Sequence, residues 1–453
     1  MIRFRRILTS FLLVTLVTTG LTAQDREASP STLETLSLED VIQIGLENNY
    51  QIRLIRLDAD IAANNDTPGN AGFLPILDAT ASRETSVENS QFELRNDTEP
   101  QQTEGARSTQ TSAGLELTWT LFDGFRMFAR QEELSALDEM GELNLQIEME
   151  SAVEQLVRGY IGMVRIFRQL EVLHEQVDVT RERVEIARTR RDLGVGSDYD
   201  LLEAETDLSA DQAAVMQQER LLRTARIQLN EQMGVDATRM YRVEEEIVLN
   251  DRLNLQELYP GLQRGNRQLE QIRLEKRLAE LELRQIRGER YPELEVFSGF
   301  RYNRTDGGGG FMRFNQTDGF HVGLTARLPL FDGFNLQRRI ENASIQMRRS
   351  DLAMEQLHAR LESILQQSWN DYQSALSMVE LEQGNLRNAE ERMEIALERY
   401  REGVISALEL RESQRAYLAA ESRLTDAMHA TKVAETELLV LTGHLEQLAI
   451  EAP

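Results

Sequence analysis

The pentapeptide Leu-Phe-Asp-Gly-Phe occurs at residues 121–125 and recurs unchanged at residues 330–334, 209 positions further on. The same offset relates Gly194 to Gly403. An offset that stays constant over so long a stretch leaves no room for insertions, which loops tolerate and long rigid elements do not. The chain is therefore predicted to contain two copies of one structural unit.

The N-terminal parts of the two halves match each other at a larger offset of 217, which relates Pro75 to Pro292. The first half must therefore hold extra residues between its proline and its pentapeptide. We place them in the polar stretch 88–107, whose counterpart in the second half is 303–318. Polar, glycine-containing segments are typical of turns and loops, so both stretches are predicted to be surface loops.

Residues 126–193 contain no proline and are rich in helix formers, and so is the counterpart 335–402. At 1.5 Å per residue each helix would be about 100 Å long. Such a length favours a coiled coil or a helical array over an ordinary globular helix. Gly194 and Gly403 are expected to end these helices as C-cap glycines.

Two shorter helices are predicted to accompany each long helix. They are residues 38–66 and 198–233 in the first repeat (24–234), and 255–288 and 407–442 in the second (253–443), with a linker at 235–252 between the repeats. Each is about half as long as the long helix. A long helix beside two stacked half-helices would give a wall of even height.

Before each pentapeptide the hydrophobic period changes to two, in residues 111–121 and 320–330. Alternation over this length is typical of outer-membrane barrel strands, although a half-buried sheet on a soluble core has the same pattern. Partner strands are predicted at about 76–87 and 293–302, the first of them from the repeat alone. Membrane barrels start at about eight strands. The barrel must therefore be shared, and the pattern leaves two, three or four copies open.

Four residues are expected to form the strand-to-helix turns: Asp123, Gly124, Asp332 and Gly333. Trp119 lies four residues before the first of these turns. Aromatic residues gather at membrane–water interfaces, so Trp119 is predicted to lie at the periplasmic edge of the barrel.

Composition excludes several classes of function. The chain has no Cys and a formal net charge of -26, which excludes disulfides and thiolate metal sites and repels nucleic acid. Its five histidines are scattered and form no metal-ligand pair at helical spacing, and no phosphate-binding loop is present. We therefore expect no metal, no cofactor and no enzyme activity.

The first 23 residues read as a secretory signal peptide. Arg3, Arg5 and Arg6 precede an apolar run from residue 7 to residue 17. A membrane anchor is the alternative, but the run is shorter than the ~20 residues that a spanning helix needs. The protein is therefore expected to be exported.

These features together resemble the TolC-like outer-membrane efflux family, over nearly the whole chain after residue 23. The order and duplication of the motifs carry the resemblance more than any single one. The motifs are Leu-Ser-Leu-Glu-Asp at 36–40, Asn48-Asn49, Leu74-Pro75, Leu-Pro-Leu-Phe-Asp-Gly at 328–333 and Gly-Val-Ile-Ser-Ala-Leu-Glu-Leu at 403–410.

The resemblance implies a mainly α fold with a β-barrel segment: a homotrimer with a 12-stranded outer-membrane barrel on a periplasmic α-helical barrel. It also implies passive exit, in efflux or type I secretion, of substrates delivered by an inner-membrane transporter of the RND or ABC type through a periplasmic adaptor. An exported periplasmic coiled-coil scaffold or adaptor is the alternative. An adaptor, however, does not need two hairpins that carry one-sided apolar strands.

The family's channel closes at its periplasmic tip, which here corresponds to the turns at 194–200 and 403–409. The resemblance implies two acidic rings from Glu409 and Glu412. The 209 offset adds Asp200 and Glu203 as a second pair. The alternative is that these are solvated carboxylates favoured by the helix dipole.

Tyr400 matches a gate tyrosine that, in the family's best-known member, acts with an acidic residue at the place of Asp200. Ile405 stands where that member has the arginine of the gate. The resemblance therefore leaves a salt-bridge lock of the familiar kind in doubt.

Overall fold

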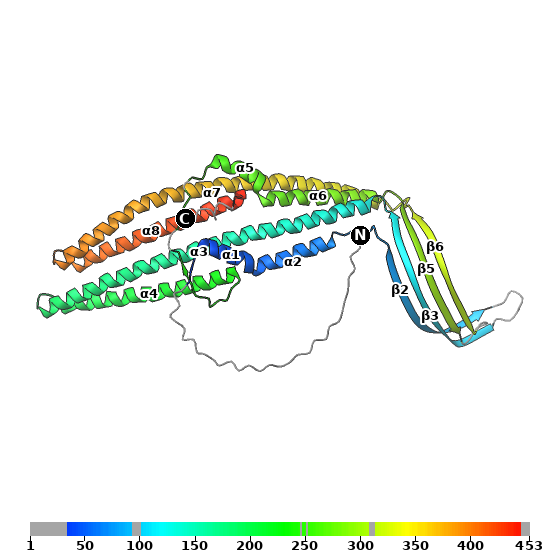
Figure 1. Cartoon of the computed structure of the whole chain (residues 1–453), viewed down its shortest axis with the longest axis horizontal. Helices are drawn as coiled ribbons and strands as arrows, with labels where there is room; N and C mark the ends of the chain where they lie inside the picture. Colours follow the sequence, from blue (N-terminus) through cyan, green and yellow to red (C-terminus); the bar gives the residue numbers. More distant parts are fainter. Residues whose placement is uncertain (1–33, 93–100, 245–246, 251, 308–312, 445–453) are drawn as a thin grey trace, which may run out of the picture.

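The computed structural model describes residues 34–92, 101–244, 247–250, 252–307 and 313–444. Figure 1 shows a long bundle of helices at one end and a β-sheet at the other. The predicted signal peptide, 1–23, lies outside the described residues, as does all but the first residue of the tail predicted at 444–453.

Two helices run the length of the bundle. They are α3 (Arg126–Asp192) and α7 (Asn335–Arg401), with 67 residues each. Each ends one residue earlier than the sequence predicts, because Leu193 and Glu402 are C-caps. Their antiparallel partners α4 (Asp198–Met233) and α8 (Ala407–Thr442) have the bounds expected from the sequence.

The front segment of each repeat is broken into two helices, so the prediction of single helices at 38–66 and 255–288 was wrong. The first repeat has α1 (Leu38–Asn48) and α2 (Tyr50–Asn65). The second has α5 (Leu255–Gly265) and α6 (Arg267–Gly288). The break falls at an asparagine whose side chain caps the second helix and competes with helical hydrogen bonding.

The predicted stacking of half-helices is confirmed for the second piece of each front segment. Helix α2 continues the line of α4 and α6 continues that of α8 (Figure 1). Helix α3 contacts α4, α2, α8 and α6, and α7 contacts α8 and α6. The bundle is therefore an arc whose outer members are α7 on one side and α2 with α4 on the other.

The sheet holds β2 (Ile76–Phe92), β3 (Gln101–Phe122), β5 (Glu293–Gly307) and β6 (Phe314–Arg327), antiparallel in that order. The strands extend well into the stretches predicted as loops, so that prediction was wrong for most of 88–107 and 303–318. Residues 93–100 and 308–312 lie outside the described residues. Strand β6 ends at Arg327 rather than at the predicted residue 330, because Pro329 has no backbone N–H to donate a hydrogen bond to a neighbouring strand.

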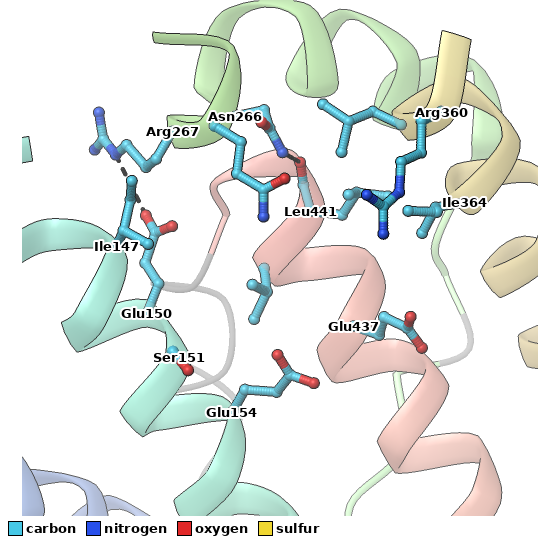
Figure 2. A pocket seen from close by; sticks show the side chains of 13 residues that line it. Ile147, Glu150, Ser151, Glu154, Asn266, Arg267, Arg360, Ile364, Glu437 and Leu441 are labelled. Atoms are coloured by element: carbon cyan, nitrogen blue, oxygen red, sulfur yellow. Dashed lines mark hydrogen bonds and ion pairs between the residues drawn. The ribbon is translucent and has the colours of Figure 1, made fainter. Parts of the chain in front are cut away.

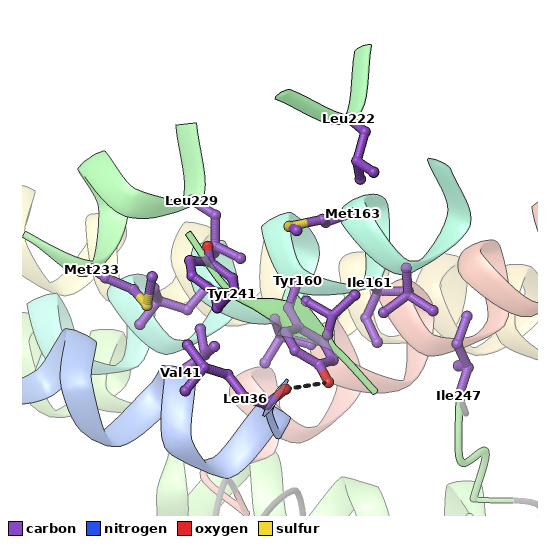
Figure 3. Close-up of a cluster of buried hydrophobic side chains, with 14 of the residues drawn as sticks. Leu36, Val41, Tyr160, Ile161, Met163, Leu222, Leu229, Met233, Tyr241 and Ile247 are labelled. Carbon is purple, nitrogen blue, oxygen red and sulfur yellow. Dashed lines mark hydrogen bonds between the residues drawn. The ribbon is translucent and has the colours of Figure 1, made fainter. Parts of the chain in front are cut away.

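The largest apolar core lies midway along the bundle, where the linker between the repeats crosses it (Figure 3). Short strands β1 (Thr35–Leu36) and β4 (Arg242–Val243) pair in parallel there. The hydroxyl of buried Tyr160 donates to the carbonyl of Leu36 at 3.1 Å and accepts from the N–H of Glu244 at 3.1 Å. The start of the linker is thereby fixed to α3.

Candidate functional site: a two-faced sheet and a helical tip

One face of the sheet is apolar across all four strands. Register places Trp119, Val296 and Leu324 in one row and Leu115, Phe300 and Phe320 in another. These side chains are exposed in the single chain: Phe320 is 72% exposed and Leu324 65%. Aromatic and aliphatic side chains on an uncovered sheet face indicate contact with lipid or another apolar surface.

The opposite face is polar. Asp78, Glu116, Gly299 and His321 form one row across the four strands. Glu116 also forms an ion pair with Arg301 at 3.8 Å. Side chains alternate between the two faces of a strand, so the sheet separates an apolar surface from a water-compatible one.

The apolar face has a limited height. It runs from Leu294 to Tyr302 on β5, and the next residue on that face is Arg304. Nine residues match the length of strand that crosses a bilayer, roughly 9–11 residues. Beyond this level most side chains on both faces are polar, which explains why the sequence pattern indicated loops there.

Each strand-to-helix turn contains two consecutive residues with positive φ: Gly124 (75°) with Phe125 (68°), and Gly333 (72°) with Phe334 (64°). A side chain on Gly124 would collide with the carbonyl of Gly288. The carbonyl of Asp123 accepts a hydrogen bond from Arg126 Nε at 2.8 Å. In the second turn Asp332 accepts one from the N–H of Leu336 at 2.6 Å. Both turns therefore fix the entry into a long helix.

An aromatic cluster surrounds these turns, of which the sequence analysis identified only Trp119. Phe125 packs edge-on against Phe122 and Tyr291, with ring centroids 5.1 and 6.0 Å apart. Phe73 likewise packs on Phe128. Trp119 Nε1 donates to the carbonyl of Phe73 at 2.9 Å. The pentapeptide's own phenylalanines were the signal that could have revealed the cluster.

At the other end of the bundle, Gly194 and Gly403 form the helix-ending turns with φ of 75° and 78°. In each turn the following N–H bonds back to the last turn of the helix, Val195 to Arg190 and Val404 to Arg399, both at 2.9 Å. This is the pattern of a Schellman motif.

Asp200 and Glu409 have a structural role that the sequence analysis did not assign. Each occupies position N3 of a capping box, with Ser197 at the N-cap of α4 and Ser406 at that of α8. Glu409 Oε2 accepts from the N–H of Ser406 at 2.9 Å. The first carboxylate of each acidic pair is therefore held at the helix start.

Tyr400 is buried beneath Arg190, which is the main tip residue that sequence reasoning missed. The guanidinium carbon lies 4.9 Å from the ring centroid, and the same group donates to the Tyr400 carbonyl at 2.6 Å. Burial raises the pKa of Tyr400; the charges of Arg190 and Arg183 oppose this shift, and those of Asp200 and Glu203 add to it. The cation that contacts Tyr400 is therefore Arg190 of the other hairpin.

Glu409 and Glu412 face a different set of side chains. Both line a pocket of about 430 Å³ between α7 and α8, together with Arg392, Arg399 and exposed apolar residues such as Leu408. The two carboxylates share one helix face, as their spacing indicates.

A buried ionic network joins the two hairpins just above the tip. Arg411 on α8 makes two hydrogen bonds to Asp211 on α4, at 2.8 and 2.9 Å. Thr180 donates to the same carboxylate at 2.7 Å. Burial alone would raise the pKa of Asp211, but these hydrogen bonds outweigh it and hold the pKa below its ordinary value. Asp207 pairs with Arg183, which is only 2% exposed.

A family model described as outer membrane efflux protein matches residues 41–235 and 258–444. The chain belongs to that family. It is therefore an outer-membrane efflux channel protein, and its family is one of channel proteins rather than enzymes. The family description places the protein in the outer membrane.

Solved structures of such channels share the fold at low sequence identity. The outer-membrane channel OprN is 18% identical, with a TM-score of 0.71 and 90% of each chain covered. VceC from Vibrio cholerae is 16% identical, with a TM-score of 0.70, over 90% of this chain and 96% of that one. The Campylobacter jejuni channel CmeC is 14% identical, with a TM-score of 0.72, over 90% and 85%. Among curated proteins, none matches the chain.

In this efflux channel a further pocket of about 460 Å³ opens where α8 ends and α6 begins (Figure 2). Two of its lining carboxylates form ion pairs: Glu150 with Arg267 at 3.3 Å, and Glu154 with Arg158, outside the pocket, at 2.7 Å. The pocket therefore marks the junction of two stacked helices rather than a reaction centre.

The described residues hold neither a metal site nor a helical membrane span. No group of three or more His, Cys, Asp or Glu among them could hold a metal ion. No helix in that part of the efflux channel is long and apolar enough to cross a membrane.

Proposed function

We propose that three copies of the chain form one channel, with a 12-stranded outer-membrane barrel above a periplasmic tunnel of helices. The observation that carries the proposal is the four-stranded sheet. Within the described residues, β2 and β6 each have a neighbour on one side only. In lipid every strand edge must be paired, so β6 of one copy pairs with β2 of the next until the ring closes.

The helical part supports the same assembly. Apolar side chains lie exposed on α2 and α4 at one side of the arc, and on α7 at the other. The two sides differ, so the interface is head-to-tail, and such interfaces form closed rings when the rotation permits. The apolar sheet face then meets lipid, and the row with Asp78, Glu116 and His321 faces the water-filled interior.

The channel is passive in this proposal, and the energy comes from its partners. The tip docks on a periplasmic adaptor, which connects it to an inner-membrane transporter of the RND or ABC type. The acidic tip residues Glu409, Glu412, Asp200 and Glu203 line the narrowest part of the pore. Substrates leave the cell through the tunnel without being released into the periplasm.

Native mass spectrometry of the detergent-solubilised protein tests the assembly. Three copies per particle are expected, with recovery from the outer-membrane fraction. A folded, monodisperse monomer in detergent-free water would overturn the proposal. Co-purification with an adaptor after chemical crosslinking in cells tests the second part, and loss of that adduct on deletion of residues 403–409 is expected if the tip is the docking point.

A further inference from the structure

Ion pairs mark the line along which α3 of the first repeat meets α6 of the second, which we term the within-chain seam. Each pair has its cation on α6 and its anion on α3. They are Arg267–Glu150 at 3.3 Å, Arg277–Glu139 at 3.3 Å and Arg284–Glu132 at 2.8 Å. The within-chain seam therefore has the same charge polarity at all three contacts.

The internal repeat gives the corresponding line between copies. Helix α6 begins 217 positions after α2, and α7 begins 209 positions after α3. Packing follows these offsets: Gln131 donates to Asp66 in the first repeat, and the equivalent Ile340 and Leu283 share an apolar cluster in the second. In the ring, α7 of one copy therefore meets α2 of the next as α3 meets α6. We term this line the between-chain seam, and it rests on the oligomer proposed above.

Burial differs between equivalent positions as this arrangement requires. Leu274 on α6 is 6% exposed, whereas its counterpart on α2, Leu57, is 58% exposed. Leu143 on α3 is 4% exposed, and its counterpart on α7, Leu352, is 66% exposed. Helices α2 and α7 lie at opposite sides of the arc (Figure 1). A second copy of the chain is the partner that covers both leucines at once.

The charges in the middle of the two seams have opposite polarity. The counterparts of Arg277 and Glu139 are Asp60 on α2 and Arg348 on α7, both exposed in the single chain. The anion of the between-chain seam therefore lies on the helix that corresponds to α6, and the cation on the helix that corresponds to α3. At the other two contacts the between-chain seam has Thr67 opposite Glu341 and Tyr50 opposite Ala359.

These signs distinguish a pair of unlike repeats from a pair of like repeats. If α3 of one copy packed on α2 of another, Glu139 would meet Asp60. If α7 of one copy packed on α6 of another, Arg348 would meet Arg277. Like charges brought together at an interface suppress the wrong pairing. Attraction arises at both seams only where a first repeat meets a second.

We propose that these four residues, which we term the pairing charges, make first and second repeats alternate around the ring. The pairing charges are Asp60, Glu139, Arg277 and Arg348. The apolar residues cannot make this distinction. Leucine occupies both members of each equivalent pair, 57 with 274 and 143 with 352, so leucine meets leucine in either arrangement.

Single charge reversals test the between-chain seam in the full-length protein. Asp60→Arg and Arg348→Asp each place like charges across it, at every such seam of the ring. Each should lower several-fold the amount of heat-modifiable oligomer in the outer-membrane fraction, and the two together should restore it. Asp58→Arg and Arg349→Asp are the matched controls, because they reverse the same charges at exposed neighbouring positions. They should assemble as the parent does.

Reversal of the within-chain pair separates discrimination between partners from simple attraction. Arg277→Asp with Glu139→Arg keeps an ion pair in the within-chain seam but gives both seams the same polarity. The yield of oligomer should fall several-fold, and native mass spectrometry should show particles of other sizes. Reversal of all four pairing charges makes the polarities different again and should recover the parent's yield and particle size.

Three results would overturn the proposal. They are parent-like yields of the single reversals, parent-like assembly of the within-chain reversal, and failure of the fourfold reversal to recover. Each of these is read against a parent that native mass spectrometry shows to be an oligomer. A monomeric parent would instead refute the proposed assembly itself.

Discussion

The side-chain amide of Asn266 donates a hydrogen bond to the main-chain carbonyl of Leu441 at 2.9 Å, joining the start of α6 to the end of α8. The same side chain accepts from the N–H of Leu269 at 3.0 Å. In the first repeat Asn49 makes the equivalent bond to Gln232 at 2.8 Å. One asparagine per repeat thus forms hydrogen bonds with backbone groups at the ends of two helices, which have no partner within their own helix.

Asn266→Ala should therefore destabilise the protein by more than the loss of an ordinary N-cap residue does. Loss of the cap and of a buried hydrogen bond together should cost about 2–3 kcal/mol. Asn254→Ala is the matched control, because Asn254 is exposed and caps only α5; about 1 kcal/mol is expected there. Thermal unfolding in detergent compares the two, and equal shifts in Tm would contradict the double role.

Trp119→Asp should impair assembly in the outer membrane. Trp119 lies on the apolar face beside Val296 and bonds to the carbonyl of Phe73. A carboxylate on that face would meet lipid at the membrane interface. Thr118→Asp is the control, since the adjacent residue points to the polar face. The measurement is the amount of heat-modifiable oligomer in the outer-membrane fraction, and equal yields would count against the lipid-facing assignment.

Acid should loosen the junction between the hairpins. The folded-state pKa of Asp211 lies below its ordinary value of 3.8. Its contribution to stability is therefore complete above that value and is lost as the pH falls through the lower, folded-state pKa. The Tm of the natural protein should exceed that of Asp211→Asn at pH 6, and the difference should shrink below about pH 4. A difference in Tm that stays constant with pH would show that it does not arise from the ionised carboxylate of Asp211, and no difference at pH 6 would show that the Arg411–Asp211 pair adds no stability.

The repeat and the long helices could be predicted from the sequence because their signals are local. A constant offset, an absence of proline and a terminal glycine fix α3, α4, α7 and α8 to within a residue. The break at Asn49 escaped prediction because the helical hydrophobic pattern continues through it. Only the contact with Gln232, 183 positions away, shows why the chain stops there.

The strand ends and the contacts at the tip could not be predicted from the sequence, for a different reason. Above Tyr302 most side chains on both faces of the strands are polar, so no hydrophobic alternation marks them. At the tip the spacing of Glu409 and Glu412 was visible, but the position of Arg190 over Tyr400 depends on the packing of two hairpins. Sequence reasoning found the acidic residues and missed the cation.

The last prediction concerns ion selectivity at the tip. Three copies would place six carboxylates of Glu409 and Glu412 around one water-filled constriction, and rings of acidic side chains favour cations in pores. Glu409→Gln with Glu412→Gln is the suitable change, because glutamine at N3 retains the capping box that alanine would remove. Cation preference and block by divalent cations from the periplasmic side should weaken together in planar-bilayer recordings, with little change in Tm. Glu355→Gln with Glu380→Gln removes the same charge from exposed sites on α7 above the tip and should leave both properties unchanged. If the tip variant keeps the parent's selectivity and block, the rings do not act there, and Asp200 with Glu203 is the next pair to neutralise.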